Sequence, residues 1–267
     1  MFSKGVYLEG KTAVITGGSS GIGKEITLIL AKNGVNTAIC SIDDEKLLQM
    51  LKKELVDIYP KDEKQHFLIY KADIRSKKEM QTFRGLIRKT FSKIDILVAN
   101  AGTTDKKHHP ILELEYKLWK EIIDINLNGT FITIKTFLQD IISTRGNIVV
   151  ITSLLGQKGH AVPNDAAYCS SKFGIEGLKE VLAKEMEFKG VNVNSLYPGT
   201  KVRTNFFNEL PIEEQQKLED PSIIEDPLIF LVSLLPGEMT GKDINVKKWL
   251  EDVSYREGFK KYSSIWR

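Results

Sequence analysis

The sequence predicts an α/β fold in which a doubly wound parallel sheet carries helices on both faces. The first observation is that short apolar runs alternate with longer amphipathic runs along nearly the whole chain. The second is that the first apolar runs are almost continuous, which fits strands buried on both sides. The length of 267 residues, without an internal repeat or linker, favours a single domain over residues 1–267.

Seven strands are expected, at Thr12–Thr16, Thr37–Cys40, His66–Tyr70, Ile94–Ala99, Asn147–Thr152, Val191–Leu196 and Asp243–Val246. Helical patterns lie between and after them, near residues 22–33, 44–58, 76–91, 116–142, 166–189 and 223–235. These elements use nearly the whole chain, which supports one seven-stranded sheet.

The composition is that of an ordinary soluble globular protein, with 42% hydrophobic and 27% charged residues. The 38 basic and 35 acidic residues are interspersed, which gives no reason to expect nucleic acid or a membrane surface as a partner. Cys40 and Cys169 suggest neither a disulfide framework nor a metal site. No apolar run reaches membrane-spanning length, and residues 1–5 lack the apolar stretch of a signal peptide. We therefore expect a cytoplasmic protein without a metal.

The strongest single signal is the turn after the first strand, Thr16–Gly23, which reads TGGSSGIG. Gly17, Gly21 and Gly23 permit tight backbone paths and close approach of a ligand. The helix that follows offers its N-terminal amides and the positive end of its dipole to a pyrophosphate. Such a turn can be a simple connector, but in this place of an α/β pattern it predicts dinucleotide binding.

The end of the second strand is expected to meet the adenosine ribose. Ser41 can bond weakly to a 2′-hydroxyl or a 2′-phosphate, and Ile42 can bond to neither. Asp43 and Asp44 are expected to cap the next helix, although either can bend back to the ribose. This stretch is the least decisive for function.

Polar residues also follow the third and fourth strands, at the rim where ligands bind in open α/β sheets. Asp73 and Asn100–Gly102 are candidates there, with loop polarity as the alternative. His108 and His109 follow in the next loop; because adjacent side chains point apart, we expect solvated residues that at most touch a substrate. Further on, Asn126 opposes helix propensity inside a long helical pattern. Such a break marks a functional site, or else a junction of two helices.

Tyr168 and Lys172 are four residues apart, which places both side chains on one face of a predicted helix. A phenol ionises near pH ~10, and a lysine ammonium beside it favours the phenolate and lowers that pKa. With the Ser153 hydroxyl to hold the oxygen of a carbonyl or alcohol, the three residues suit proton transfer to or from a C–O group. Such a pair alone is more often a solvated helix face, and the rest of the pattern favours catalysis.

Together with Pro198-Gly199, these motifs resemble the short-chain dehydrogenase/reductase family, from about residue 8 to about 248. The resemblance implies a Rossmann-type sheet, NAD(P)(H)-dependent oxidoreduction of a carbonyl and alcohol pair, and a homotetramer or homodimer. It implies that Tyr168 is the general acid or base and that Lys172 bonds the nicotinamide ribose and lowers the tyrosine pKa. Ser153 would orient the substrate oxygen, and Asn126 would hold a water in a proton relay.

The resemblance also implies a set of cofactor-binding residues along the chain. They are Gly17, Ser19, Ser20, Gly21, Ile22, Gly23, Ser41, Asp73, Ile74, Asn100, Ala101, Gly102, Tyr168, Lys172, Pro198, Gly199, Val202 and Thr204. The segment after Pro198-Gly199 is one residue longer than usual, which leaves the roles of Val202 and Thr204 open.

Other departures from the family pattern concern the cofactor and the substrate. Ser20 and Ile42 stand where NADP-preferring members often carry a basic residue, and Ser41 stands where NAD-preferring members carry Asp. Because the acid that would repel a 2′-phosphate is missing, we expect NADP(H) to be preferred, with NAD(H) possible. Fifteen residues separate Ser153 from Tyr168 where many members have thirteen, and the extra length falls in residues 160–165, beside the substrate. This spacing is similar to the sorbose/mannitol and carbonyl reductase branch.

We therefore expect an NADPH-preferring reductase, or the reverse dehydrogenase, that acts on a small or medium carbonyl compound. An NAD-dependent alcohol or polyol dehydrogenase is one alternative, and a non-catalytic nucleotide-sensing protein of the same fold is another. Residues 205–224 are expected to form a lid, with Phe206, Phe207 and Leu210 as an apolar wall. Residues 249–267 are expected to form a C-terminal extension with a helix docked on its own or a neighbouring subunit.

Overall fold

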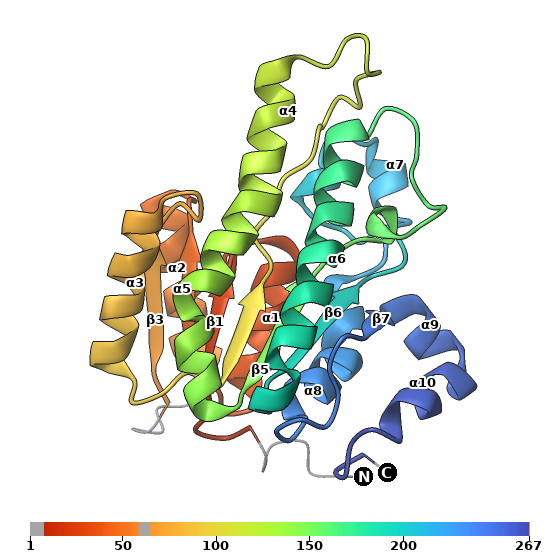
Figure 1. Ribbon diagram of the computed structural model, residues 1–267. Helices are drawn as coiled ribbons and strands as arrows, with labels where there is room; N and C mark the ends of the chain where they lie inside the picture. Colours follow the sequence, from red (N-terminus) through yellow and green to blue (C-terminus); the bar gives the residue numbers. More distant parts are fainter. Residues whose placement is uncertain (1–7, 59–64, 267) are drawn as a thin grey trace.

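Seven parallel strands form one sheet in the order β3-β2-β1-β4-β5-β6-β7 in the computed structural model, which describes residues 8–58 and 65–266 (Figure 1). The strands are β1 (Thr12–Thr16), β2 (Asn36–Ser41), β3 (Phe67–Lys71), β4 (Ile96–Ala99), β5 (Asn147–Ile151), β6 (Asn192–Tyr197) and β7 (Asp243–Asn245). The order reverses between β1 and β4, and ligands of open α/β sheets bind at the carboxyl ends of strands beside such a reversal. The predicted fold class is confirmed. Residues 1–5, where the sequence shows no signal-peptide stretch, lie outside the described residues.

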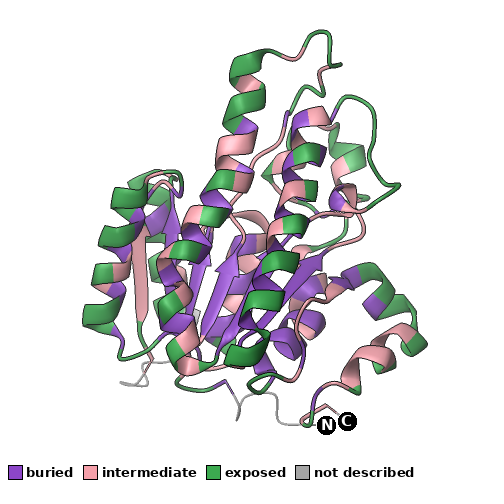
Figure 2. Cartoon of the chain, in the orientation of Figure 1, coloured by how far each residue is buried: buried purple, intermediate pink, exposed green. Residues whose placement is uncertain are grey.

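Helices cover both faces of the sheet. One face carries α1 (Gly21–Lys32), α2 (Glu45–Ile58) and α8 (Glu225–Ser233), and the other carries α3 (Lys77–Thr90), α5 (Gly129–Thr144) and α6 (Ala166–Met186). In β1, Ala13 and Ile15 pack in the first core and Val14 packs in the second, as the alternation of a strand requires. Full burial of a large apolar side chain contributes ~1.5–3 kcal/mol, which is why both faces of the strand are apolar. Figure 2 shows the buried strands between helices whose outer faces are exposed.

The long helix before β5 is widened where the sequence predicted a break. α4 (Tyr116–Ile123) passes through a π-helical turn, Asp124–Asn128, into α5, and both flanking residues keep helical dihedral angles. A π turn inserts one extra residue into the helix and is frequent at functional sites. The turn carries Asn126 inward, where its side chain is fully buried. The break is therefore a local widening of one continuous helix.

One prediction for the C-terminal end is wrong in detail. Val246 was expected in the last strand, but it begins α9 (Val246–Glu251), because the side chain of Asn245 accepts a hydrogen bond from the Lys248 N–H at 3.1 Å and caps a helix there. The tail then has a second short helix, α10 (Val253–Lys260), within the extension where a helix is expected. Asp252 separates the two by capping α10 through the Tyr255 N–H at 3.0 Å.

The tail packs on the core of its own chain, which is one of the two positions expected for it. Trp249 is fully buried, with its ring centroid 5.0 Å from that of Phe230. The indole Nε1 of Trp266 donates a hydrogen bond to the Ser233 hydroxyl at 2.9 Å. The extension thus completes the hydrophobic core around α8.

Candidate active site

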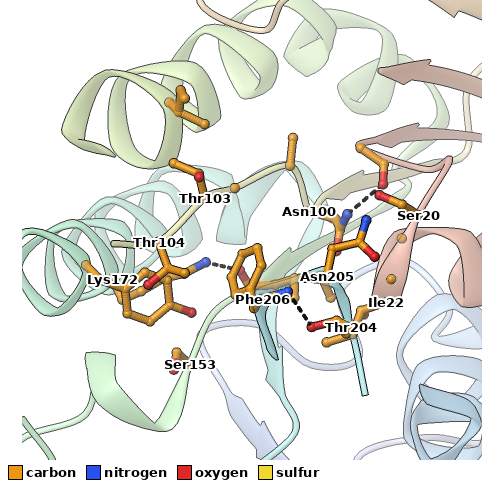
Figure 3. A pocket seen from close by; sticks show the side chains of 18 of the residues that line it. Ser20, Ile22, Asn100, Thr103, Thr104, Ser153, Lys172, Thr204, Asn205 and Phe206 are labelled. Carbon is orange, nitrogen blue, oxygen red and sulfur yellow. Dashed lines mark hydrogen bonds between the residues drawn. The ribbon is translucent and has the colours of Figure 1, made fainter. Parts of the chain in front are cut away.

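A cleft of about 910 Å³ lies at the carboxyl ends of the strands. Figure 3 shows Ser20, Ile22 and Asn100 on one side of it and Ser153 and Lys172 on the other, with Phe206 between them. Of all the predicted site residues, only Ser19 and Asn126 are absent from its lining. The residues that line it are Gly17, Ser20, Gly21, Ile22, Gly23, Ser41, Asp73, Ile74, Asn100, Ala101, Gly102, Ser153, Tyr168, Lys172, Pro198, Gly199, Val202 and Thr204.

The glycine-rich turn is a tight backbone path that other residues would not follow. Gly17 has φ +63° and Gly21 has φ +53°, in the left-handed region that favours glycine. A Cβ on Gly23 would lie 2.0 Å from the carbonyl oxygen of Gly17, so the start of α1 packs directly on the turn. Ser20, the residue before α1, makes no side-chain hydrogen bond to the first helical turn. The N-terminal amides of α1 are therefore left for an anion at this edge of the cleft.

Asn100 fastens the turn to the end of β4. Its Nδ2 donates hydrogen bonds to the carbonyl oxygens of Thr16 at 2.9 Å and Gly17 at 3.2 Å. The Thr16 hydroxyl in turn accepts from the backbone N–H groups of Asn100 and Ala101. The amide side chain of Asn100 thereby holds the two strand ends that form the floor of the cleft.

The end of β2 brings a carboxylate toward the glycine-rich turn. Asp44 caps α2 by accepting from the Leu47 N–H at 2.9 Å, whereas Asp43 bends back and accepts a hydrogen bond from the Ser19 hydroxyl. Of the two roles expected for these aspartates, Asp44 caps the next helix, and Asp43 turns back toward the side of the cleft where the ribose is expected. Ser41 and Ile42 line the cleft beside Asp43, and these three residues supply no basic group.

Asp73 also lines the cleft, but its carboxylate is already paired. Arg75 donates from Nε to both carboxylate oxygens, at 3.0 and 2.9 Å, and from Nη2 at 2.6 Å. These hydrogen bonds from Arg75 lower the pKa of Asp73. The guanidinium is thereby committed to Asp73, at the same end of the cleft.

Ser153, Tyr168 and Lys172 meet on the opposite side. The Ser153 hydroxyl is close enough to the Tyr168 phenol to lower its pKa, and both residues line the cleft. The ammonium of Lys172 lies 5.6 Å from the centre of the Tyr168 ring and donates to the carbonyl oxygen of Ile151 at 3.1 Å. Gly156 packs directly against α6 at Lys172, because a Cβ on Gly156 would lie 2.9 Å from the Cβ of Lys172. The spacing in the sequence thus corresponds to one acid/base cluster.

Burial is the largest effect on the electrostatics of this cluster. Burial raises the pKa of Tyr168 to about 12, and the nearby Ser153 hydroxyl opposes that rise. Burial lowers the pKa of Lys172 to about 8, and the charge of Glu176 opposes that fall. The cost of burying charge is the largest effect on both groups, so the net pKa of Tyr168 is raised, and the effect of Lys172 on the tyrosine stays a prediction.

Asn126 lies behind the cleft and supports it. Its Oδ1 accepts from the Thr103 N–H at 2.7 Å, and its Nδ2 donates to the Thr103 carbonyl at 2.9 Å and to the Ser171 hydroxyl at 2.9 Å. Ser171 in turn donates to the carbonyl oxygen of Tyr168 at 2.7 Å. Sequence reasoning missed Thr103 and Ser171, although Ser171 stands inside the Tyr168–Lys172 motif.

The lid covers the cleft as expected. It comprises a 3₁₀ turn at Asn205–Phe207, the short helix α7 (Ile212–Gln215) and a second 3₁₀ turn at Pro221–Ile224. Phe206, Phe207 and Leu210 line the cleft, and the Phe206 ring meets that of Tyr168 edge-on at 6.3 Å. The predicted apolar wall is confirmed.

His108 corrects a further expectation. It lines the cleft, and its Nδ1 lies 2.9 Å from the Asp165 carboxylate, whereas His109 pairs with Asp105 outside the lining. The sequence predicted two solvated histidines, because a contact across 57 positions leaves no periodic signal.

Two general properties of the described residues bear on function. Within residues 8–58 and 65–266, no helix is both long and apolar enough to cross a membrane. Over those same ranges, no cluster of three or more His, Cys, Asp or Glu residues is arranged to hold a metal ion.

Comparisons with known proteins match most of the chain. A model of the short chain dehydrogenase family matches residues 11–215. The 3-oxoacyl-[acyl-carrier-protein] reductase FabG of Rickettsia conorii is 32% identical over 251 residues, which cover 90% of this chain and 97% of that protein. The FabG of Staphylococcus epidermidis is 27% identical over 248 residues, covering 88% and 97%. None of the relatives named here is a sorbose, mannitol or carbonyl reductase, so that finer resemblance stays a prediction.

Solved structures agree with the fold. A short chain dehydrogenase from Shigella flexneri, complexed with NADP, has a TM-score of 0.80 and 25% identity, covering 91% of this chain and 99% of that one. A short-chain type dehydrogenase/reductase from Mycobacterium marinum has a TM-score of 0.78 and 24% identity, covering 89% and 94%.

Proposed function

The chain belongs to the short-chain dehydrogenase/reductase family and is an NAD(P)-dependent oxidoreductase acting on a CH–OH or carbonyl group, and we propose that it is a carbonyl reductase with Tyr168 as general acid. The observation that carries the proposal is that Tyr168 and Ser153 line one cleft, with the Lys172 ammonium 5.6 Å from the centre of the tyrosine ring. This cluster faces the glycine-rich turn across one cleft. A reduction needs both a hydride donor and a proton donor, and the two sides of the cleft suit these two tasks.

The residues present fit a dinucleotide. Gly17, Gly21 and Gly23 carry no side chains that would obstruct a pyrophosphate. The N-terminal amides of α1 are not capped by the Ser20 side chain, so they are available to the same group. Asn100–Gly102 would flank the nicotinamide end, where Gly102 leaves space against Asn126. When bound, the cofactor would supply the hydride.

The chain's own residues would manage the proton. With a pKa near 12, Tyr168 holds its proton at neutral pH and can give it to the substrate oxygen. Ser153 would hold that same oxygen, because it lines the cleft close to the phenol. Lys172 is 5% exposed, and below its pKa of about 8 its positive charge would stabilise the phenolate that forms. Asn126 would act as a positioning residue, because its side chain is occupied by Thr103 and Ser171.

Replacement of Tyr168 by Phe tests the proposal. We expect kcat/KM for a panel of ketones to fall by at least ~10²-fold, since proton transfer by a positioned side chain contributes that much. Cofactor affinity, measured by fluorescence titration, should stay within about twofold. Tyr116→Phe is the matched control, because Tyr116 is 92% exposed and lies outside the cleft lining. Normal turnover by Tyr168→Phe would overturn the assignment. Cofactor binding without reduction of any carbonyl by the unchanged chain would favour a nucleotide-sensing protein.

NADPH is the proposed cofactor. The proposal is supported by the neighbour that is complexed with NADP and by Ser41 in the place of an acid. The alternative is an NAD-dependent alcohol or polyol dehydrogenase, and one observation favours it. The Asp43 carboxylate lines the cleft beside Ser41, where it would repel a 2′-phosphate. Comparison of the dissociation constants of NADH and NADPH at one ionic strength decides between them, and tighter NADH binding would select the alternative.

Assembly and location are also proposals. A homodimer or homotetramer is supported by exposed apolar side chains on the outer faces of α5 and α6, namely Phe131, Phe173 and Val181. A cytoplasmic setting is supported by Cys40 and Cys169, which are both unpaired and buried. The single domain over residues 1–267 stays a prediction.

A further inference from the structure

A histidine and a buried carboxylate meet at the substrate end of the cleft. His108 follows β4 in a left-handed backbone conformation, with φ 53°, and its Nδ1 lies 2.9 Å from Oδ1 of Asp165. Both residues line the cleft. Asp165 is 7% exposed and stands immediately before α6, and its carbonyl oxygen accepts from the Cys169 N–H at 2.8 Å in helical register. Tyr168 is three residues further on, so Asp165 lies about one helical turn from the catalytic phenol.

The pairing determines how the imidazole can bind a ligand. A carboxylate can only accept, so Nδ1 carries the hydrogen, and in the neutral ring Nε2 keeps a free lone pair. The carboxylate of Asp165 is stabilised by the positive end of the α6 dipole, because Asp165 stands at the N-terminus of that helix. Within the part of the chain that the structure describes, Nε2 has no hydrogen-bond partner, and the side chain is 53% exposed. A hydrogen-bonding atom is therefore held in a fixed orientation and left available.

The pair itself favours a neutral substrate group over an anion, although two ammonium groups, those of Lys106 and Lys201, also line the cleft. Asp165 contributes a negative charge directly beside the ring, so the pair is neutral when the imidazole is protonated and negative when it is not. Such a pair offers little attraction to a carboxylate or phosphate. Val162, Phe206 and Leu210 add apolar walls to the cleft. A hydroxyl group that donates to Nε2 fits both the charge and the lone pair.

We propose that His108, oriented by Asp165, is a specificity-determining residue that accepts a hydrogen bond from a substrate hydroxyl close to the reacting carbon. The substrate class is then a hydroxylated ketone or aldehyde. This inference rests on the proposed reductase function and names the substrate for that same cleft.

A pair of ketones that differ by one hydroxyl tests the inference. We would measure kcat/KM for 1-hydroxy-2-butanone and 2-butanone with the unchanged chain and with His108→Leu. The unchanged chain should prefer the hydroxyketone by about threefold to tenfold, the range that one net hydrogen bond supports. His108→Leu should lose that preference, measured as the ratio of the two kcat/KM values within each protein. His109→Leu is the matched control, because that neighbouring histidine pairs with Asp105 and lies outside the lining; it should keep the preference.

A binding measurement separates this inference from the proposed function. The affinity for 1-hydroxy-2-butanone, measured by calorimetry in the presence of NADP⁺ or NAD⁺, should fall threefold to tenfold in His108→Leu whether or not turnover is observed. An unchanged affinity and an unchanged substrate ratio in His108→Leu would overturn the inference and leave the reductase intact. A preference for a keto acid that disappears in His108→Leu would also overturn it, since the recognised group would be an anion. Binding that depends on His108 without any turnover would overturn the reductase instead.

Discussion

The hydroxyl of Ser19 donates a hydrogen bond to the carboxylate of Asp43, which ties the glycine-rich turn to the segment after β2. The bond lies between residues 24 positions apart and brings a negative charge to the place where the adenosine ribose is expected. The Ser41 hydroxyl accepts a hydrogen bond from the Asp43 N–H at 3.2 Å, which also fixes the backbone of Asp43. We therefore expect cofactor preference to depend on Asp43, a residue outside the usual acidic position.

Replacement of Asp43 by Asn should raise the affinity for NADPH relative to NADH by about tenfold. The reason is that two like charges several ångströms apart at an intermediate dielectric repel by ~1–2 kcal/mol, and Asn removes the charge while it can still accept from Ser19. Fluorescence titration with both cofactors at one ionic strength measures the ratio. Asp44→Asn is the control, because it removes the same charge from the next residue, which caps α2. An equal change in both variants would show that only net charge matters.

The parts of the site that depend on local backbone were predictable from the sequence. The turn from Gly17 to Gly23 requires glycine for conformation and close packing, and a strand–helix pattern places it. The Tyr168 and Lys172 spacing follows from the helical repeat. Asn126 was predictable as a break because its neighbours oppose helix formation, although the π turn itself was not.

The remaining features depend on contacts between distant segments or on burial, which leave no periodic pattern. His108 and Asp165 meet across 57 positions, and no local pattern connects them. The pKa of Tyr168 follows from how deeply the phenol is buried. Val246 was placed in the last strand because it is β-branched and apolar, yet the side chain of Asn245 starts a helix there.

The pH profile of reduction should report the ionisation of Lys172. Its pKa is about 8, so the charged form is complete below that pH and is lost above it. We expect kcat/KM for a ketone to be level between about pH 6 and 7.5 and to fall as pH rises through about 8. Tyr168 stays protonated over this range, because its pKa is about 12.

Glu176→Gln provides the check on that assignment. The Glu176 carboxylate raises the Lys172 pKa, so its neutral replacement should move the descending limb of the profile to lower pH. Gln preserves an acceptor for the Gln157 amide, which now donates to Glu176 at 2.8 Å. A limb at the same pH in both proteins would mean that another group controls the reaction.

Tyr255 protects the edge strand β7, and its loss should lower stability without affecting the cleft. Its hydroxyl accepts from the Asn245 N–H at 3.0 Å and donates to the Asp243 carbonyl at 3.2 Å, on the last strand of the sheet. Tyr255→Phe removes both bonds and leaves two edge groups to water, so the free energy of unfolding should fall by about 1–2 kcal/mol and Tm by a few degrees. Tyr262→Phe is the control, because within the described residues that hydroxyl has no hydrogen-bond partner. Equal Tm values for the two variants would show that the tail is held by its rings alone, through contacts such as that of Trp249 with Phe230.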